Sequence, residues 1–487
     1  MRVDRLAGCA LAAVLTACVS SKGIHPDGKP LDAAALHAER SLTEVPVSAA
    51  AWPAQDWWRA IGDEHLTALI DEALRDNPGL AEVDARARGA RAQVEALDAA
   101  RGPGVGADGA VTGAYLSRHE AGLVLPEATG TFAWERTIGL DFSWGLDLWG
   151  GKRAAWEAAL GRSRAADIDR RAARVRLSVN VARAYIRLRE ACVQHDIAQR
   201  DLERTARIRE LTRLYIKSGL GTSDAQHQVD TEAGIADQRV AQADEAIDAA
   251  RIALATLLGK GPDRGLDLAK PDALKPLALA VPANLPVDLL GRRPDLVAAR
   301  WRVEAAARSI DAVKTEFLPN VDIDVLAGLI SLGPNNSLFN LPARNYSITG
   351  AVSMPVFDGG RLRAKLDATD AEYDFAVAGY NVAVVRALNE VAELLSRLKS
   401  IRAQLQIQDK VLQNARRSWD DATLRYKSGL GTELDTLTVR HQLLAAEQNL
   451  AALCSREADV SVQLIDALGG GFQENGGERK RAAAGED

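Results

Sequence analysis

The chain has 487 residues and a net charge of -6, with 26% charged residues and only 5% aromatic residues. A composition dominated by leucine, alanine and charged residues is typical of long helices rather than of compact mixed domains. The acidic balance and the lack of a basic stripe argue against a nucleic-acid partner.

Residues 1–17 have the pattern of a secretory signal peptide. Arg2 and Arg5 are followed by an apolar run over 6–14 and then by small residues. The stretch that ends at Cys18 (Leu-Thr-Ala-Cys) resembles the bacterial lipobox, whose cysteine becomes the lipidated first residue of the mature protein. Because small residues precede Cys18 and a polar segment follows it, we expect lipid attachment at Cys18. Because Val19 rather than an aspartate follows, we expect residence in the outer membrane. No cofactor is expected besides this covalent lipid.

Two alternatives for the N-terminus stay open. Cys9 also ends a lipobox-like stretch, although almost no apolar run precedes it, and the signal could be an ordinary cleaved one. No later segment offers about 20 uninterrupted apolar residues, so no spanning helix is expected and any crossing of a bilayer would need a closed β-barrel. A disulfide between Cys192 and Cys454 is permitted in an oxidising periplasm but is not expected.

The predicted elements begin after an extended segment at 18–60. A helical period starts near Glu64, is interrupted at Asn77-Pro78 because the residue before proline avoids the α region, and continues to Arg101. A matching helix begins at 293 and ends just before Leu318-Pro319, and the prolines of the two segments have the same spacing.

After each of these helices the hydrophobic period changes from 3.6 to 2, which predicts amphipathic strands. In the clearest example, Ile138, Leu140 and Phe142 alternate with polar or small residues. We predict two strand pairs, one in each half, with strands at about 104-117 and 134-148, and at about 320-332 and 345-356.

A long helical hairpin follows each strand pair, at 150–258 and 359–468. The outgoing helices end near Leu214 and Tyr426, so each is about 100 Å long at 1.5 Å per residue. Both hairpins turn at the same six letters, which are Lys217, Ser218, Gly219, Leu220, Gly221 and Thr222 in the first copy and Lys427, Ser428, Gly429, Leu430, Gly431 and Thr432 in the second.

The chain is therefore predicted to be an internal duplication. One repeat covers 61–258 and the other covers 293–468, with a Pro- and Gly-rich linker at 259–292. The tail at 469–487 is expected to be disordered.

Apolar residues of the first long helix form two opposed stripes. One stripe contains Val175, Val179, Ala182 and Ile186, and the other contains Leu177, Val181, Ala184 and Leu188. Two stripes suit a helix with a neighbour on each flank, as in a wall. A helix inside a bundle explains the same pattern.

No residue pattern predicts catalysis or metal binding, so we expect that the protein is not an enzyme. The match to G-x-G-x-x-G at 104–109 follows a helix and opens a strand, whereas a dinucleotide site needs the reverse order. The seven histidines show no i, i+4 pair, and no Cys-x-x-Cys occurs.

Four strands cannot close a barrel, because the smallest membrane barrels need about eight. The chain must therefore assemble with copies of itself. Three copies supply about twelve strands and two supply about eight, and both numbers can close.

With these elements the chain resembles the TolC-like outer membrane efflux proteins, in particular their lipid-anchored branch of the OprM/NodT type. The resemblance covers 52–468 and is carried by the segments Trp57-Trp58 to Asn77-Pro78, Leu285 to Asp295, Phe317 to Pro319, Phe357 to Gly360, and the paired tips. It implies a mainly α fold with a membrane β-barrel, in which a homotrimer builds one α-barrel/β-barrel tunnel from four strands and long hairpins per subunit.

The resemblance also implies partners and a gate. Family members work with a periplasmic adapter and an inner membrane pump of the resistance-nodulation-division type, and export drugs, dyes, metals or similar small molecules. In the family the hairpin tips close the periplasmic end and contact the adapter. By position, Tyr426 and Asp435 match gate residues of the second hairpin, and Asp224 lies one residue before the usual aspartate of the first. In the alternative interpretation these residues only cap helices, with Thr222 and Thr432 as N-caps.

Two other functions fit the same elements. One is an outer membrane duct for type I protein secretion, which has the same fold and a different cargo. The other is a coiled-coil structural lipoprotein without a pore, which would not need the amphipathic strands.

Overall fold

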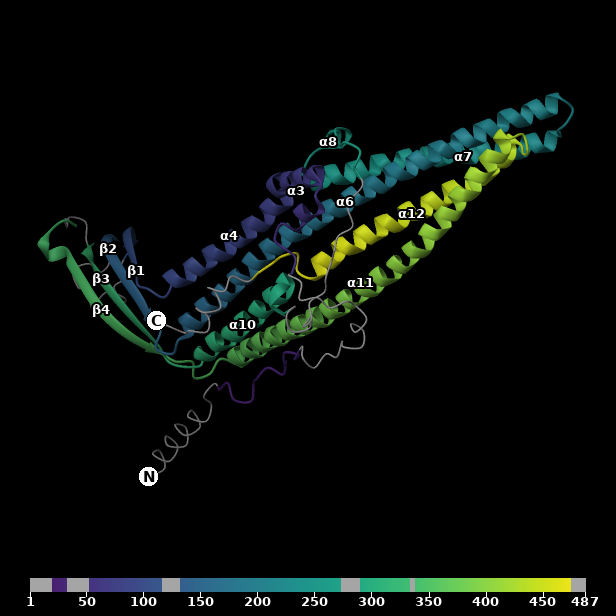
Figure 1. Cartoon of the computed structure of the whole chain (residues 1–487). Coiled ribbons are helices and arrows are strands. Elements are labelled where there is room, and N and C mark those ends of the chain that lie inside the picture. Colours follow the sequence, from purple (N-terminus) through teal and green to yellow (C-terminus); the bar gives the residue numbers. More distant parts are fainter. Residues whose placement is uncertain (1–19, 33–51, 116–131, 273–289, 333–337, 474–487) are drawn as a thin grey trace. The chain divides into compact units, whose positions relative to one another are not determined.

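The structure is a computed structural model that describes residues 20–32, 52–115, 132–272, 290–332 and 338–473 (Figure 1). The signal peptide and Cys18 lie outside these residues, as do parts of the predicted linker and tail.

The chain forms two compact units, and each of them combines segments of both predicted repeats. Unit 1 contains Met1–Pro30, Ala87–Ala166 and Ala299–Tyr380, and unit 2 contains Leu31–Arg86, Asp167–Ala298 and Asn381–Asp487. The division into two repeats along the sequence is thus not a division into two packed bodies.

Unit 1 contains one antiparallel sheet with the order β1-β2-β3-β4. Its strands are β1 (Gly104–Tyr115), β2 (Phe132–Leu146), β3 (Asn320–Leu332) and β4 (Arg344–Ser353). The expectation of two separate pairs was incomplete, because β2 of the first half pairs with β3 of the second half from Glu135↔Leu332 to Leu146↔Val321.

The register gathers the apolar residues of all four strands on one face. Val105 lies opposite Phe142, Phe142 opposite Val325, and Val325 opposite Ile348. Val105 and Ile348 are 72% and 78% exposed in the single chain. This face therefore lacks cover from the described part of the chain, which is unusual for apolar residues in water.

Two strands end earlier than predicted, and in both places local chemistry opens the next helix. β2 ends at Leu146, because the Asp147 carboxylate accepts hydrogen bonds from the backbone N–H groups of Lys152 (2.9 Å) and Arg153 (2.8 Å). β4 ends at Ser353, shortly before Pro355, which has no N–H for a ladder. Asp358 then accepts from the backbone N–H groups of Gly360 and Leu362.

The helices are α3 (Glu64–Asp76), α4 (Pro78–Ala99), α6 (Gly151–Lys217), α7 (Ser223–Leu257), α8 (Asp263–Leu266), α10 (Pro294–Thr315), α11 (Arg361–Lys427) and α12 (Glu433–Ala467), with short 3-10 turns η2 (Trp57–Ile61) and η4 (Leu341–Ala343). Both stripes of α6 are buried in the core of unit 2, where Val181 and Ala182 are fully buried. Two opposed apolar faces are covered within one chain, as the pattern predicted.

The predicted disordered tail was wrong for its first residues. Gly469, Gly470 and Gly471 all have positive φ and turn the chain back after α12, and Phe472 is buried. Glycines are needed here because L side chains rarely adopt this conformation. The rest of the tail, 474–487, lies outside the described residues.

Among the helices that the structure describes, none combines the length and apolar character needed to cross a membrane. In the part of the chain that the structure describes, Cys192 and Cys454 are free thiols.

Candidate functional site

The repeated six-residue phrase ends one helix and begins the next in the same way in both hairpins. At the first tip Gly219 has φ of 76°, and the backbone N–H groups of Gly219 and Leu220 donate to the carbonyls of Ile216 (3.0 Å) and Tyr215 (2.8 Å). At the second tip Gly429 and Leu430 make the same two bonds at the same lengths. This pattern is a Schellman motif, in which a glycine in the left-handed conformation satisfies the last carbonyls of a helix.

The threonine that closes each phrase caps the returning helix. The Thr222 hydroxyl accepts from the backbone N–H of Ala225 at 3.4 Å, and the Thr432 hydroxyl accepts from that of Asp435 at 3.2 Å. Only the second tip has a full capping box, because the Asp435 carboxylate also accepts from the backbone N–H of Thr432 at 3.1 Å. The alternative of a capping role is therefore confirmed for both threonines.

Each tip presents one large apolar side chain to solvent. Leu220 is 77% exposed and Leu430 is 79% exposed. The Schellman geometry holds each leucine outside its helix, immediately after the glycine. Both tips therefore present an exposed leucine to solvent, and a lysine stands three residues before each leucine.

An ion pair near the second tip joins the two hairpins. The Arg207 guanidinium of α6 donates to both carboxylate oxygens of Glu433, from Nε at 2.8 Å and from Nη2 at 3.0 Å. The Tyr426 hydroxyl of α11 donates to the same carboxylate at 3.4 Å. A two-point guanidinium–carboxylate contact fixes orientation as well as distance, so α6 and the first turn of α12 are held in register.

The electrostatics of this link favour its charged form. The hydrogen bond from Arg207 holds the pKa of Glu433 below its usual range, and the same bond raises the pKa of Arg207. Both side chains are partly exposed, at 42% for Arg207 and 25% for Glu433. The pair is therefore open to water and to competing contacts, as a reversible link needs to be.

The predicted gate residues occupy different places. Tyr426 takes part in the link with Glu433. The Asp435 carboxylate is bound to its own cap, since Thr432 donates to it from the hydroxyl at 2.7 Å, and this bond lowers the pKa of Asp435. Asp224 accepts from the side-chain amide of Gln228 one turn further along α7. In the described part of the chain, no hydrogen bond or ion pair links Asp224 with Asp435.

Two further ion pairs continue the connection between α6 and α12 away from the tips. Arg200 donates to Glu447 at 2.7 Å, and Arg183 donates to Asp459 from Nε at 2.6 Å. In all three pairs the arginine lies on α6 and the carboxylate on α12. We call these three pairs the hairpin ladder.

Arg207 and Glu433 were not predicted from the sequence as functional residues. Their pairing joins residues that are 226 positions apart, and no local period or motif marks such a contact. The available signal was the acidic first turn of α12, where Glu433 follows the cap. In the described part of the chain, no group of three or more His, Cys, Asp or Glu residues could hold a metal ion.

Comparison with known proteins places these hairpins and strands in a family. The model of the family described as "Outer membrane efflux protein" matches residues 69–260 and 285–470, which are the two predicted repeats with small shifts. The multidrug resistance outer membrane protein MdtP of Escherichia coli (strain K12) is 28% identical over 478 residues, which cover 97% of this chain and 98% of MdtP.

Solved structures agree with the sequence match. The outer membrane protein VceC of Vibrio cholerae is 32% identical with a TM-score of 0.78, and the match covers 87% of this chain and 100% of VceC. The outer-membrane channel OprN is 27% identical with a TM-score of 0.78, and the match covers 94% of this chain and 99% of OprN. The chain belongs to the outer membrane efflux protein family.

Proposed function

We propose that this chain is the outer membrane channel subunit of a tripartite efflux system. It would conduct small molecules such as drugs, dyes or metals from a periplasmic adapter and an inner membrane pump to the exterior. The observation that carries the proposal is the pair of hairpins that end in identical, exposed tips and are joined by the hairpin ladder. A family relative, MdtP, is named a multidrug resistance outer membrane protein, which supports this cargo class.

We propose a homotrimer as the working assembly. β1 and β4 form the outer edges of the four-stranded sheet that the structure describes, and the sheet carries an uncovered apolar face. Unpaired edges and apolar residues both favour joining with further copies in the presence of lipid. Three copies joined edge to edge would remove every free edge.

The link between Arg207 and Glu433 is proposed as the restraint of the periplasmic gate. It ties the first turn of α12 to the neighbouring hairpin, so the second tip cannot move away while the pair is intact. An adapter that binds the exposed Leu220 and Leu430 more tightly in the open channel than in the closed channel would increase the fraction of open channels. In this proposal Asp435 and Asp224 line the constriction as exposed acids rather than as the restraint.

Single-channel recording in planar bilayers tests the restraint. We expect Glu433→Gln and Arg207→Gln each to raise the conductance or the open fraction, because either change removes the charged two-point contact. The double variant should add little to either single variant, since both remove the same bond. Arg213→Gln is the matched control, because this exposed arginine lies on the same helix outside the link. Wild-type conductance in both single variants would show that the link does not restrain the gate.

We also propose a lipid anchor on Cys18 in the outer membrane. The described segment that begins two residues later is held along α11, where the Ser20 carbonyl accepts from Arg363 at 2.9 Å and the Gly28 N–H donates to Asp374 at 2.6 Å. Arg363 lies in the first turn of α11, which follows β4, so the segment starts close to the sheet. This placement supports a lipid at the adjoining membrane surface.

Metabolic labelling with radioactive palmitate tests the anchor. We expect Cys18→Ser to abolish labelling and Cys9→Ser to leave it unchanged. Labelling that survives in Cys18→Ser and disappears in Cys9→Ser would move the anchor to the other cysteine.

A further inference from the structure

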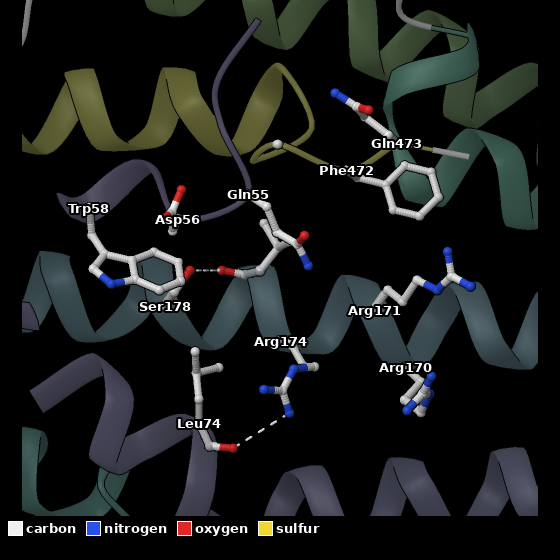
Figure 2. Close-up of a pocket in the computed structure, with 12 residues that line it drawn as sticks. Gln55, Asp56, Trp58, Leu74, Arg170, Arg171, Arg174, Ser178, Phe472 and Gln473 are labelled. Atoms are coloured by element: carbon white, nitrogen blue, oxygen red, sulfur yellow. Dashed lines mark hydrogen bonds between the residues drawn. The ribbon is translucent and has the colours of Figure 1, made fainter. Parts of the chain in front are cut away.

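We propose that a pocket in unit 2 binds a small organic anion with a phosphate or carboxylate group and an apolar or aromatic body. The pocket has a volume of about 840 Å³ and lies over an arginine-rich stretch of α6 (Figure 2). Its other walls come from the segment around Gln55, from α3, and from the chain after α12. None of the tip or link residues takes part, so this site does not depend on the proposed channel function.

The pocket carries more positive than negative charge, because three arginines line it beside one carboxylate, that of Asp56, which lies 3.4 Å from Arg59. Arg170 and Arg171 share one carboxylate, because both donate to Asp167 at 3.1 Å. Arg170 also lies 3.8 Å from Asp84, which is a weak contact. For Arg174, the one hydrogen bond within the described residues is a long one of 3.5 Å to the carbonyl of Leu74. The guanidinium of Arg174 therefore has no carboxylate partner in the part of the chain that the structure describes.

The walls of the pocket are fixed by close backbone packing. A Cβ on Gly471, whose φ is +82°, would lie 2.2 Å from the Ala54 carbonyl oxygen, and a Cβ on Gly470 would lie 2.1 Å from Val175. Only glycine fits at such distances, so the chain after α12 is pressed against both the Ala54 segment and α6. The rings of Trp58 and Phe472 are buried at 8% and 6% exposure. The cavity is thus built from rigid parts.

The chemistry of the lining points to the ligand class. Guanidinium groups bind phosphate and carboxylate through two parallel hydrogen bonds, and the amides of Gln55 and Gln473 add polar groups at the rim. Arg171 lies on the side of Phe472 and Arg174 on the side of Leu74, so each of these two arginines shares its side of the cavity with an apolar side chain (Figure 2). A few fixed polar groups in a cavity of several hundred Å³ are typical of small-molecule sites.

Calorimetric titration of the full-length protein in detergent tests the proposal. Phenyl phosphate carries both a phosphate group and an aromatic ring, and benzoate carries a carboxylate in place of the phosphate. Inorganic phosphate has no aromatic ring, and benzamidine has an aromatic ring with a positive charge. We expect phenyl phosphate or benzoate to bind at one site per chain, inorganic phosphate to bind more weakly, and benzamidine not to bind.

Arg174→Gln and Arg171→Gln should each weaken binding by about tenfold, because each removes a two-point anion contact. Arg174 is exposed, so this variant should keep its helical circular dichroism. Arg187→Gln, at an exposed position of α6 outside the pocket, should bind as the wild type does. No saturable binding of either aromatic anion, or equal affinity in wild type and both pocket variants, would overturn the proposal.

Discussion

Replacing Arg293 by alanine should destabilise unit 2, because its buried guanidinium makes four hydrogen bonds there. The side chain is 9% exposed and connects the start of α10 with α11 and the end of α12. It donates to both oxygens of Asp295 at 3.0 and 2.8 Å, to Glu390 at 2.8 Å, and to the carbonyl of Ala467 at 3.0 Å. Alanine leaves two carboxylates and one carbonyl without this partner.

The expected loss in the free energy of unfolding depends on how deeply the partners of Arg293 are buried. Breaking a buried ion pair by removing one member costs about 3–5 kcal/mol, because the remaining charge stays uncompensated. Asp295 and Glu390 are 31% and 41% exposed, so water can partly replace the guanidinium. We therefore expect the lower end, about 3 kcal/mol. Arg293→Lys should lose less, because an ammonium group keeps the charge but cannot reach all partners at once.

Thermal unfolding followed by circular dichroism at 222 nm measures this loss. With an unfolding entropy of about 2.1 cal/mol/K per residue, a unit of about 300 residues loses roughly 1.6 °C in Tm per kcal/mol, so Arg293→Ala should lower Tm by about 5 °C. The neighbouring Arg292→Ala is the matched control, because Arg292 lies over the ring of Trp52 at 5.0 Å and such a contact contributes only about 0.5–1 kcal/mol. A Tm of Arg293→Ala within about 1 °C of wild type would refute the argument that this residue holds three helices together.

Burial raises the pKa of Asp466, so its charged form opposes folding and Asp466→Asn should raise Tm at neutral pH. The gain should shrink as the pH falls through the raised folded-state pKa and vanish only below the ordinary aspartate pKa of about 3.9, where the carboxyl becomes protonated in the unfolded state as well. Thr432→Ala should speed amide hydrogen exchange in the first turn of α12 more than Thr222→Ala does in α7, because only Thr432 belongs to a capping box; equal effects would contradict this. Gly28→Ala should expose the 20–31 segment to limited proteolysis, since its Cβ would lie 2.8 Å from Asp374, and an unchanged cleavage pattern would argue against close docking.

The sequence predicted those parts of the fold that local patterns encode. The helical period and prolines gave the helix from Glu64 and its interruption at Asn77-Pro78, and alternation gave the strands to within a few residues. The tips were found because Gly219 and Gly429, with their flanking letters, determine a helix end through contacts within six residues. Such contacts depend on neighbours in sequence, so a single sequence reveals them.

Contacts between distant residues were beyond sequence reasoning. The pairing of β2 with β3 needs the register of Glu135 with Leu332, and the hairpin ladder needs Arg207 beside Glu433. Several registers of two amphipathic helices would bury similar apolar area, and only the three-dimensional packing selects one.

Neither half of the gene encodes a complete unit. Each unit draws on both halves, and β2 takes its second neighbour from the half that follows it. A gene fragment that encodes one half would produce a protein with one missing strand neighbour and with α6 deprived of its partners on α12. If the duplication began from a shorter ancestor, that ancestor needed a second molecule to supply the strand neighbour and the helix partners that the other half supplies now. Fusion of the two copies then replaced association between two molecules by a covalent connection.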